Sequence, residues 1–175
     1  MQVVDSPAQE QIVNALTRRL SFSVKIKHLD LIDKRPEDEL QTYDLWLRGQ
    51  ALFTKFNPRF WEKAERLFKL ALKKEPGYAP AYSSLAQIYN TYHLVMPGVF
   101  RDRKRSEMAL EHARQAEHLD PFDSRSHLCL AWTFANDGHH EQAVKFAVRA
   151  YELNCNDSWT QISVAGCLAI CGEHV

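Results

Sequence analysis

The sequence is poor in the residues that mark several classes of protein. Six glycines and seven prolines in 175 residues argue against a disordered chain and against a turn-rich β protein. The cysteines are few and form no C-x-x-C pair, so we expect reduced thiols and a cytoplasmic protein. No apolar run approaches the roughly 18 residues of a membrane span, so no membrane contact is expected.

The chain also lacks an excess of charge of either sign. Its 22 basic and 22 acidic residues give a formal net charge of zero, which disfavours nucleic acid as a partner. No basic stretch followed by an apolar one opens the sequence, so no targeting segment is expected. Hydrophobic residues make up 45% of the chain, which is enough to bury a core.

Residues 1–41 are predicted to hold a helix, a strand-like segment and a charged connector. Ser6 is suited to cap a helix that has Pro7 at its first position, and one face of that helix carries Ile12, Val13, Leu16 and Leu20. Residues 21–28 then alternate apolar and polar side chains, which is typical of a half-buried strand. Three alternatives stay open for this segment: pairing with a region outside this chain, pairing with its copy in a second molecule, or an extended linker.

One pattern of small and large residues recurs from residue 42 onward. Each unit is predicted to begin with a helix in which a small residue is followed three positions later by a large one: Gly49 and Leu52, Ala86 and Tyr89, Ala131 and Phe134, Ala165 and Leu168. In the second helices small residues recur at steps of three, four or seven: Ala64 and Ala71, then Ala109, Ala113 and Ala116, then Ala143, Ala147 and Ala150. Ala109 and Ala143 are 34 residues apart, as are Pro121 and Cys155 at the ends of two units. A fixed period of this kind indicates a repeat architecture.

The pattern resembles the tetratricopeptide repeat family over residues 42–175. The resemblance implies an all-α fold, a right-handed α-solenoid of antiparallel helix pairs, with units at about 42–78, 79–123 and 124–157 and a partial unit at 158–175. The second unit has 11 extra residues, placed around 91–105. Residues 43–49 and 64–82 are most similar to the carboxy-terminal repeat arrays of bacterial multidomain regulators that carry an adenylate cyclase or a winged-helix domain.

The partial unit leaves one helix without a partner. Residues 158–172 are predicted to form the first helix of a fourth unit, with Trp159, Ile162, Val164 and Leu168 as its apolar residues. A half-repeat cannot cover its own apolar face, so we expect a piece of a longer array. A homodimer through residues 158–175 or 21–28 is a further expectation.

No catalytic or metal-binding motif is recognisable. His139 and His140 are adjacent, whereas a zinc-protease helix needs two histidines four residues apart. Cys167, Cys171 and His174 share a helix face, but small buried cysteines are far commoner than ligands, and Gly172 is expected to end the helix. We therefore predict no metal, no cofactor and no enzymatic activity within these residues.

A dense basic patch lies at the start of the second helix of the second unit and comprises Arg101, Arg103, Lys104 and Arg105. Positive charge at a helix start opposes the helix dipole by a few tenths of a kcal/mol per residue, so a compensating group is expected. Two interpretations stay open: a solvated loop, or a site for an anion or an acidic segment. The preceding residues, which include Leu94 and Met96, are unusually apolar for a loop and either pack on the unit or face a partner.

Tetratricopeptide arrays bind partners mainly in the groove lined by their first helices. The resemblance places twelve residues there: Tyr43, Trp46, Gln50, Phe53, Ser83, Gln87, Asn90, Thr91, Arg125, Leu128, Trp132 and Asn136. Apart from Arg125 this lining is uncharged, so it does not suit the strongly acidic carboxy termini that some members bind. It suits a protein or peptide segment with apolar anchors, from a partner or from another domain of the same protein.

Two functions follow from this interpretation. The favoured one is a non-catalytic interaction scaffold in the regulatory, carboxy-terminal region of a larger bacterial signalling protein. The alternative is a dimerisation or support region of a multidomain enzyme whose catalytic domain lies elsewhere. Replacing Trp46 or Trp132 by Ala should abolish partner binding under the first and change only stability or oligomeric state under the second.

Overall fold

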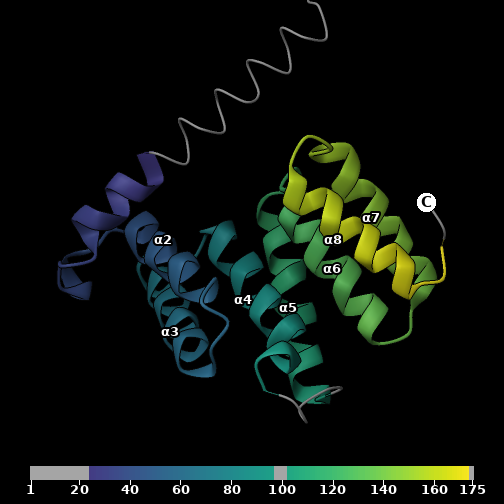
Figure 1. The fold of residues 1–175 in the computed structure, drawn as a ribbon, viewed down its shortest axis with the longest axis horizontal. Helices are drawn as coiled ribbons and strands as arrows, with labels where there is room; N and C mark the ends of the chain where they lie inside the picture. Colours follow the sequence, from purple (N-terminus) through teal and green to yellow (C-terminus); the bar gives the residue numbers. More distant parts are fainter. Residues whose placement is uncertain (1–23, 97–101, 174–175) are drawn as a thin grey trace, which may run out of the picture. The chain divides into compact units, whose positions relative to one another are not determined.

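The computed structural model describes residues 24–96 and 102–173, and the chain divides into two units between Leu40 and Gln41 (Figure 1). Within the described residues the secondary structure is helical throughout, as the all-α prediction requires, and no strand occurs. After an initial helical stretch at residues 24–32, the elements are η1 (Glu37–Glu39), α2 (Thr42–Phe53), α3 (Pro58–Lys74), α4 (Ala79–Thr91), η2 (Tyr92–Leu94), α5 (Arg103–Leu119), α6 (Ser124–Asn136), α7 (His140–Leu153) and α8 (Ser158–Ile170).

The strand predicted at residues 21–28 is wrong for the part that is described. Residues 24–32 are helical, and the side chains that are sheltered from solvent, His28, Leu29 and Ile32, recur at helical spacing. The alternating Val24 and Ile26 are instead 65% and 43% exposed. A lone strand has no partner for its backbone N–H and C=O groups, whereas a helix satisfies them locally. The helix predicted to begin at Pro7 lies outside the described residues.

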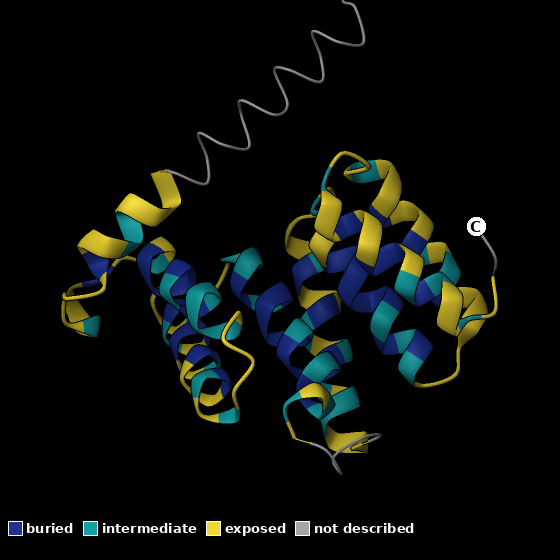
Figure 2. Cartoon of the chain, viewed as in Figure 1, coloured by how far each residue is buried: buried dark blue, intermediate teal, exposed yellow. Residues whose placement is uncertain are grey.

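In the second unit, α2, α4, α6 and α8 form a row in which each helix contacts the next. The intervening helices α3, α5 and α7 each pack against the two row helices that flank them in sequence. Figure 2 shows that α4 and α6 are buried along much of their length, whereas α7 and α8 keep exposed faces. The row helices therefore make up one layer and the intervening helices a second layer.

Alanines allow the two layers to approach closely. Every small residue that the sequence pattern places in the second helices is buried with no exposed surface: Ala64, Ala71, Ala109, Ala113, Ala116, Ala143, Ala147 and Ala150. The last three pack with Leu128 and Ala131 of α6 and with Val164 and Cys167 of α8 in one apolar cluster. Side chains three and four positions apart share a helix face, so each alanine stripe gives its neighbours a flat surface.

Local sequence fixes where the helices begin and end. Asn57, Asp102, Asp123 and Asp157 precede α3, α5, α6 and α8, and each side chain accepts a hydrogen bond from a backbone N–H of the first turn. Gly138 and Gly172 follow α6 and α8 with φ of 81° and 79°, a left-handed conformation that glycine adopts without strain. Gly172 thus ends the last helix as expected. Across the described ranges, no helix is long and apolar enough to cross a membrane.

Candidate functional site

A pocket of about 320 Å³ lies on the row of helices, between α4, α6 and α8. Its walls are mostly large apolar side chains: Leu94 after α4, Leu128 and Trp132 of α6, and Trp159 and Ile162 of α8. Polar groups come from Gln87, Asn90, Thr91, His93, Arg125 and Ser163, while Cys129 and Gly166 complete the lining. A concave, apolar surface with a few polar groups is the usual form of a binding site.

The apolar wall on α8 is open to solvent. Trp159 is 55% exposed and Ile162 is 69% exposed, although both line the pocket. On the opposite side, Leu94 is 56% exposed. The helix α8 approaches α6 closely at Gly166, where a Cβ atom would lie 3.4 Å from the Trp132 ring. Solvent-exposed tryptophan and isoleucine around a hollow mark a surface at which burial by a partner would be favourable.

Two of the predicted groove residues form hydrogen bonds that join α2 to α4. The indole Nε1 of Trp46 donates to the Pro80 carbonyl at 3.1 Å and to Ser84 Oγ at 3.0 Å. The amide of Gln50 donates to the same hydroxyl at 2.6 Å. Trp46 is only 7% exposed, so this predicted groove residue holds two helices together and offers little surface to a ligand.

Asn90 links α4 to α6 in the same way. Its Nδ2 donates to the Cys129 carbonyl at 2.9 Å, and its Oδ1 accepts from Thr133 Oγ1 at 3.0 Å. The Asn90 backbone carbonyl accepts from Asn136 Nδ2 at 3.3 Å. Asn90 is 6% exposed, and both ends of its amide are used within the fold. Burial also raises the pKa of the adjacent Cys129 thiol to about 12, so it stays protonated at neutral pH.

The structure brings together half of the twelve predicted groove residues. Six line the pocket: Gln87, Asn90, Thr91, Arg125, Leu128 and Trp132. Asn136 lines a second pocket, which Trp132 also reaches. The remaining five, Tyr43, Trp46, Gln50, Phe53 and Ser83, lie on neither pocket; Ser83 is 2% exposed, and Phe53 packs its ring 4.5 Å from that of Trp61.

Sequence reasoning missed the contribution of α8 to the pocket. Counting 34 residues onward from Arg125, Leu128 and Trp132 gives Trp159, Ile162 and Gly166, and all three of these residues line it. The same step from Cys129 gives Ser163, another lining residue. The 34-residue period found in the sequence would therefore have been enough to predict these four lining residues of α8.

Arg125 is the cation of the pocket. Its guanidinium lies over the Trp46 ring at 5.5 Å from the ring centroid, a cation–π contact that fixes its position at the amino-terminal end of α6. The lining includes no aspartate or glutamate, and within the described part of the chain no ion pair forms to the Arg125 side chain. The carboxylate of Asp123, at the start of α6, interacts electrostatically with Arg125 without lining the pocket. The pocket therefore presents a positively charged side chain beside apolar walls, with no acidic residue in the lining itself.

The described members of the basic patch do not converge. Arg103 pairs with Glu107 at 2.9 Å, and Arg105 pairs with Asp102 at 3.4 Å while its guanidinium lies 3.8 Å from the Tyr92 ring centroid. Asp102 also caps α5, which supplies the compensation expected for positive charge at a helix start. Lys104 is exposed, and Arg101 lies outside the described residues.

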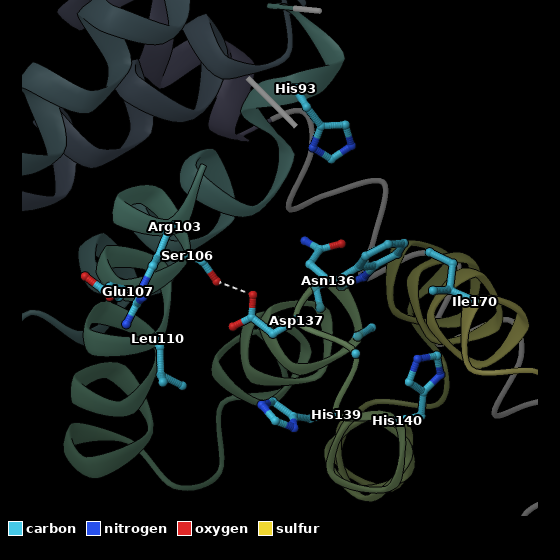
Figure 3. Close-up of a pocket in the computed structure, with 13 residues that line it drawn as sticks. His93, Arg103, Ser106, Glu107, Leu110, Asn136, Asp137, His139, His140 and Ile170 are labelled. Carbon is cyan, nitrogen blue, oxygen red and sulfur yellow. Dashed lines mark hydrogen bonds and ion pairs between the residues drawn. The ribbon is translucent and has the colours of Figure 1, made fainter. Parts of the chain in front are cut away.

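A larger pocket of about 880 Å³ opens between the ends of α5, α6 and α8 (Figure 3). Four of its polar side chains are paired with one another: Ser106 Oγ donates to Asp137 Oδ1 at 2.6 Å, and Arg103 pairs with Glu107 at 2.9 Å. His139 and His140 are exposed, and Figure 3 shows their imidazoles lying apart from one another. Among the described residues, no cluster of three or more histidine, cysteine, aspartate or glutamate side chains is placed to hold a metal ion.

A scan of the chain against protein-family models finds none that matches, and no curated protein sequence matches it. Function is therefore inferred from the geometry of the described residues.

Proposed function

We propose that the chain is a non-catalytic interaction scaffold that binds a peptide segment of a partner protein in the pocket between α4, α6 and α8. The observation that carries this proposal is the exposed apolar wall of Trp159 and Ile162 facing Trp132 across a hollow of about 320 Å³. A pocket of this size, with apolar anchoring positions and a polar margin, suits a large side chain of a bound segment.

The same proposal includes a specific architecture. Helices α2 to α7 would form three tetratricopeptide-type units, with α8 as the first helix of a fourth, in a right-handed solenoid whose groove is lined by the row α2, α4, α6 and α8. The spacing supports it, because α6 and α8 begin 34 residues apart, at Ser124 and Ser158. In a larger bacterial regulator such an array would sense a partner or an attached signalling domain. The thiols are free, which supports a reducing, cytoplasmic setting.

The test selects random dodecapeptides displayed on phage for binding to the whole 175-residue chain. The selected peptides are then synthesised, and their affinities are measured by fluorescence polarisation. Trp159→Ala should weaken binding at least about 30-fold, since truncation of a central anchor typically costs 2 kcal/mol or more. Tyr151→Ala is the matched control, because Tyr151 is an aromatic residue of α7 that is 46% exposed and lies off the pocket. If no peptide binds, or if both variants bind equally well, the proposal is wrong.

A second function is favoured by the exposed face of α8. Trp159, Ile162 and Ile170 are 55%, 69% and 50% exposed, and two such faces could bury one another in a homodimer. Under this alternative the chain supports assembly of a larger protein. Sedimentation velocity distinguishes the two: a dimer that Ile162→Glu dissociates supports the alternative, and a monomer at 100 µM, chosen as roughly a hundred times a micromolar Kd, contradicts it.

A further inference from the structure

The pocket between α4, α6 and α8 combines one positive charge with apolar walls, and the distance between these features can be estimated. Arg125 and Trp132 are seven positions apart on α6, so they stand about 10 Å apart along its axis at 1.5 Å per residue. Leu128 lies between them on the same face. An occupant that contacts both Arg125 and the apolar walls therefore needs a charged or polar group and an apolar group separated by a similar length.

A hydrogen-bonding group also faces the pocket. Gln87 of α4 lines it and is half-buried, and within the described part of the chain its side-chain amide has no hydrogen-bond partner. An amide both donates and accepts, which complements a peptide unit. A bound helix satisfies its own backbone groups and would leave Gln87 unused, whereas an extended segment presents free N–H and C=O groups to it. The Gln87 amide therefore favours an extended occupant.

Building on the proposed function, we propose that the partner segment is extended and carries one large apolar side chain and one carboxylate about three residues apart. The apolar side chain enters between Trp132, Trp159 and Ile162, and the carboxylate pairs with the Arg125 guanidinium. In a polyproline-type extended chain three residues span about 9 Å and return side chains to the same side, which matches the estimated separation. No acidic residue lines the pocket, and Asp123 interacts with Arg125 from outside it, so a carboxylate of the occupant is the group that complements Arg125 on the pocket side.

The experiment scans the position of one acid in synthetic decapeptides built on the sequences selected from the phage library. A single aspartate is moved from one to six positions away from the apolar anchor, on either side, and each peptide is compared with its asparagine counterpart by fluorescence polarisation. We expect aspartate to bind about fivefold more tightly than asparagine when it is about three positions away, on one side only, and to have little effect elsewhere. The advantage should shrink as salt is raised from 50 to 500 mM.

Arg125→Glu provides the charge-reversal arm. It should abolish the preference for aspartate and create a preference for lysine at the same peptide position, and the gained binding shows that the variant is folded. Arg125→Gln should remove the preference without reversing it. Unchanged aspartate preference in Arg125→Glu, or selected peptides with no acid at any fixed distance from the anchor, would overturn this inference. In either of those cases loss of binding in Trp159→Ala still supports the proposed function, whereas absence of all peptide binding overturns both.

Discussion

Removing the side chain of Asn90 should destabilise the fold by a predictable amount. Asn90→Ala deletes the buried hydrogen bond to the Cys129 carbonyl and the contact in which Asn90 Oδ1 shares the single Thr133 hydroxyl proton with that carbonyl. Neither partner is orphaned, because the Thr133 hydroxyl then donates to the Cys129 carbonyl alone, at 2.8 Å. At about 1 kcal/mol for the full bond and less for the shared one, we expect a loss of about 1–2 kcal/mol in the free energy of unfolding. With a urea slope of about 2 kcal/mol per M, the unfolding midpoint should fall by about 0.5–1 M.

Asn90→Asp is the matched variant, because it keeps the shape and reverses one hydrogen-bonding role. The atom that faces the Cys129 carbonyl becomes an acceptor, so two oxygens oppose each other at a site that is 6% exposed. A buried charge without a partner costs about 3–5 kcal/mol, so this variant should be the less stable at pH 7. It should recover towards the alanine variant as the pH falls and the carboxylate is protonated. Equal midpoints for wild type and Asn90→Ala, measured by circular dichroism in urea, would refute the assigned network.

Three further predictions concern other parts of the second unit. Gly49→Ala should lower the unfolding free energy by about 1–3 kcal/mol in the same urea assay, despite the better helix propensity of alanine, because its Cβ would overlap the Phe68 ring. A gain in stability would contradict this packing. Burial lowers the pKa of His112 below its ordinary 6.5, so the folded state disfavours the protonated imidazole. The free energy of unfolding should therefore fall as the pH drops below 6.5 through the folded-state pKa. His112→Gln should flatten this dependence in thermal melts between pH 7.5 and 5. Cys155 is exposed and should react with maleimide within minutes, whereas Cys129 is buried and should react only after unfolding. Mass spectrometry of the native and the urea-treated chain measures both reactions. Modification of Cys129 in the native chain would be inconsistent with its place in the core.

The helices of the second unit were predictable because their signals are local and repeated. Ala143, Ala147 and Ala150 predict a buried helix face by spacing alone, and all three are fully buried. The prediction of a strand near residue 24 was wrong because its signal is short and does not repeat. Eight residues of alternation are too few to distinguish a strand from an exposed helix, and the deciding fact, whether a partner strand exists, is not local.

The candidate site was predictable in position but not in the role of each residue. A helix face can be read from spacing, and six of the twelve predicted residues do line the pocket. Spacing cannot tell which polar side chains on that face form hydrogen bonds to the neighbouring helix, since this depends on how closely the two helices approach. Trp46 and Asn90 were therefore assigned to a ligand, although their hydrogen bonds are made to α4 and α6.

This distinction changes how the groove should be probed. Trp46→Ala would remove a hydrogen bond that the indole N–H shares between two acceptors, together with a side chain that is only 7% exposed. Loss of binding in that variant would therefore follow from damaged packing under either proposed function. Trp159 and Ile162 are different, since most of their surface is in solvent and little of the fold depends on them. Binding that is lost in Ile162→Ala, with a free energy of unfolding within about 0.5 kcal/mol of wild type, therefore reports on the surface itself. Because these two residues stand 34 positions after Arg125 and Leu128, they also test whether the repeat period extends to the binding surface as well as to the core.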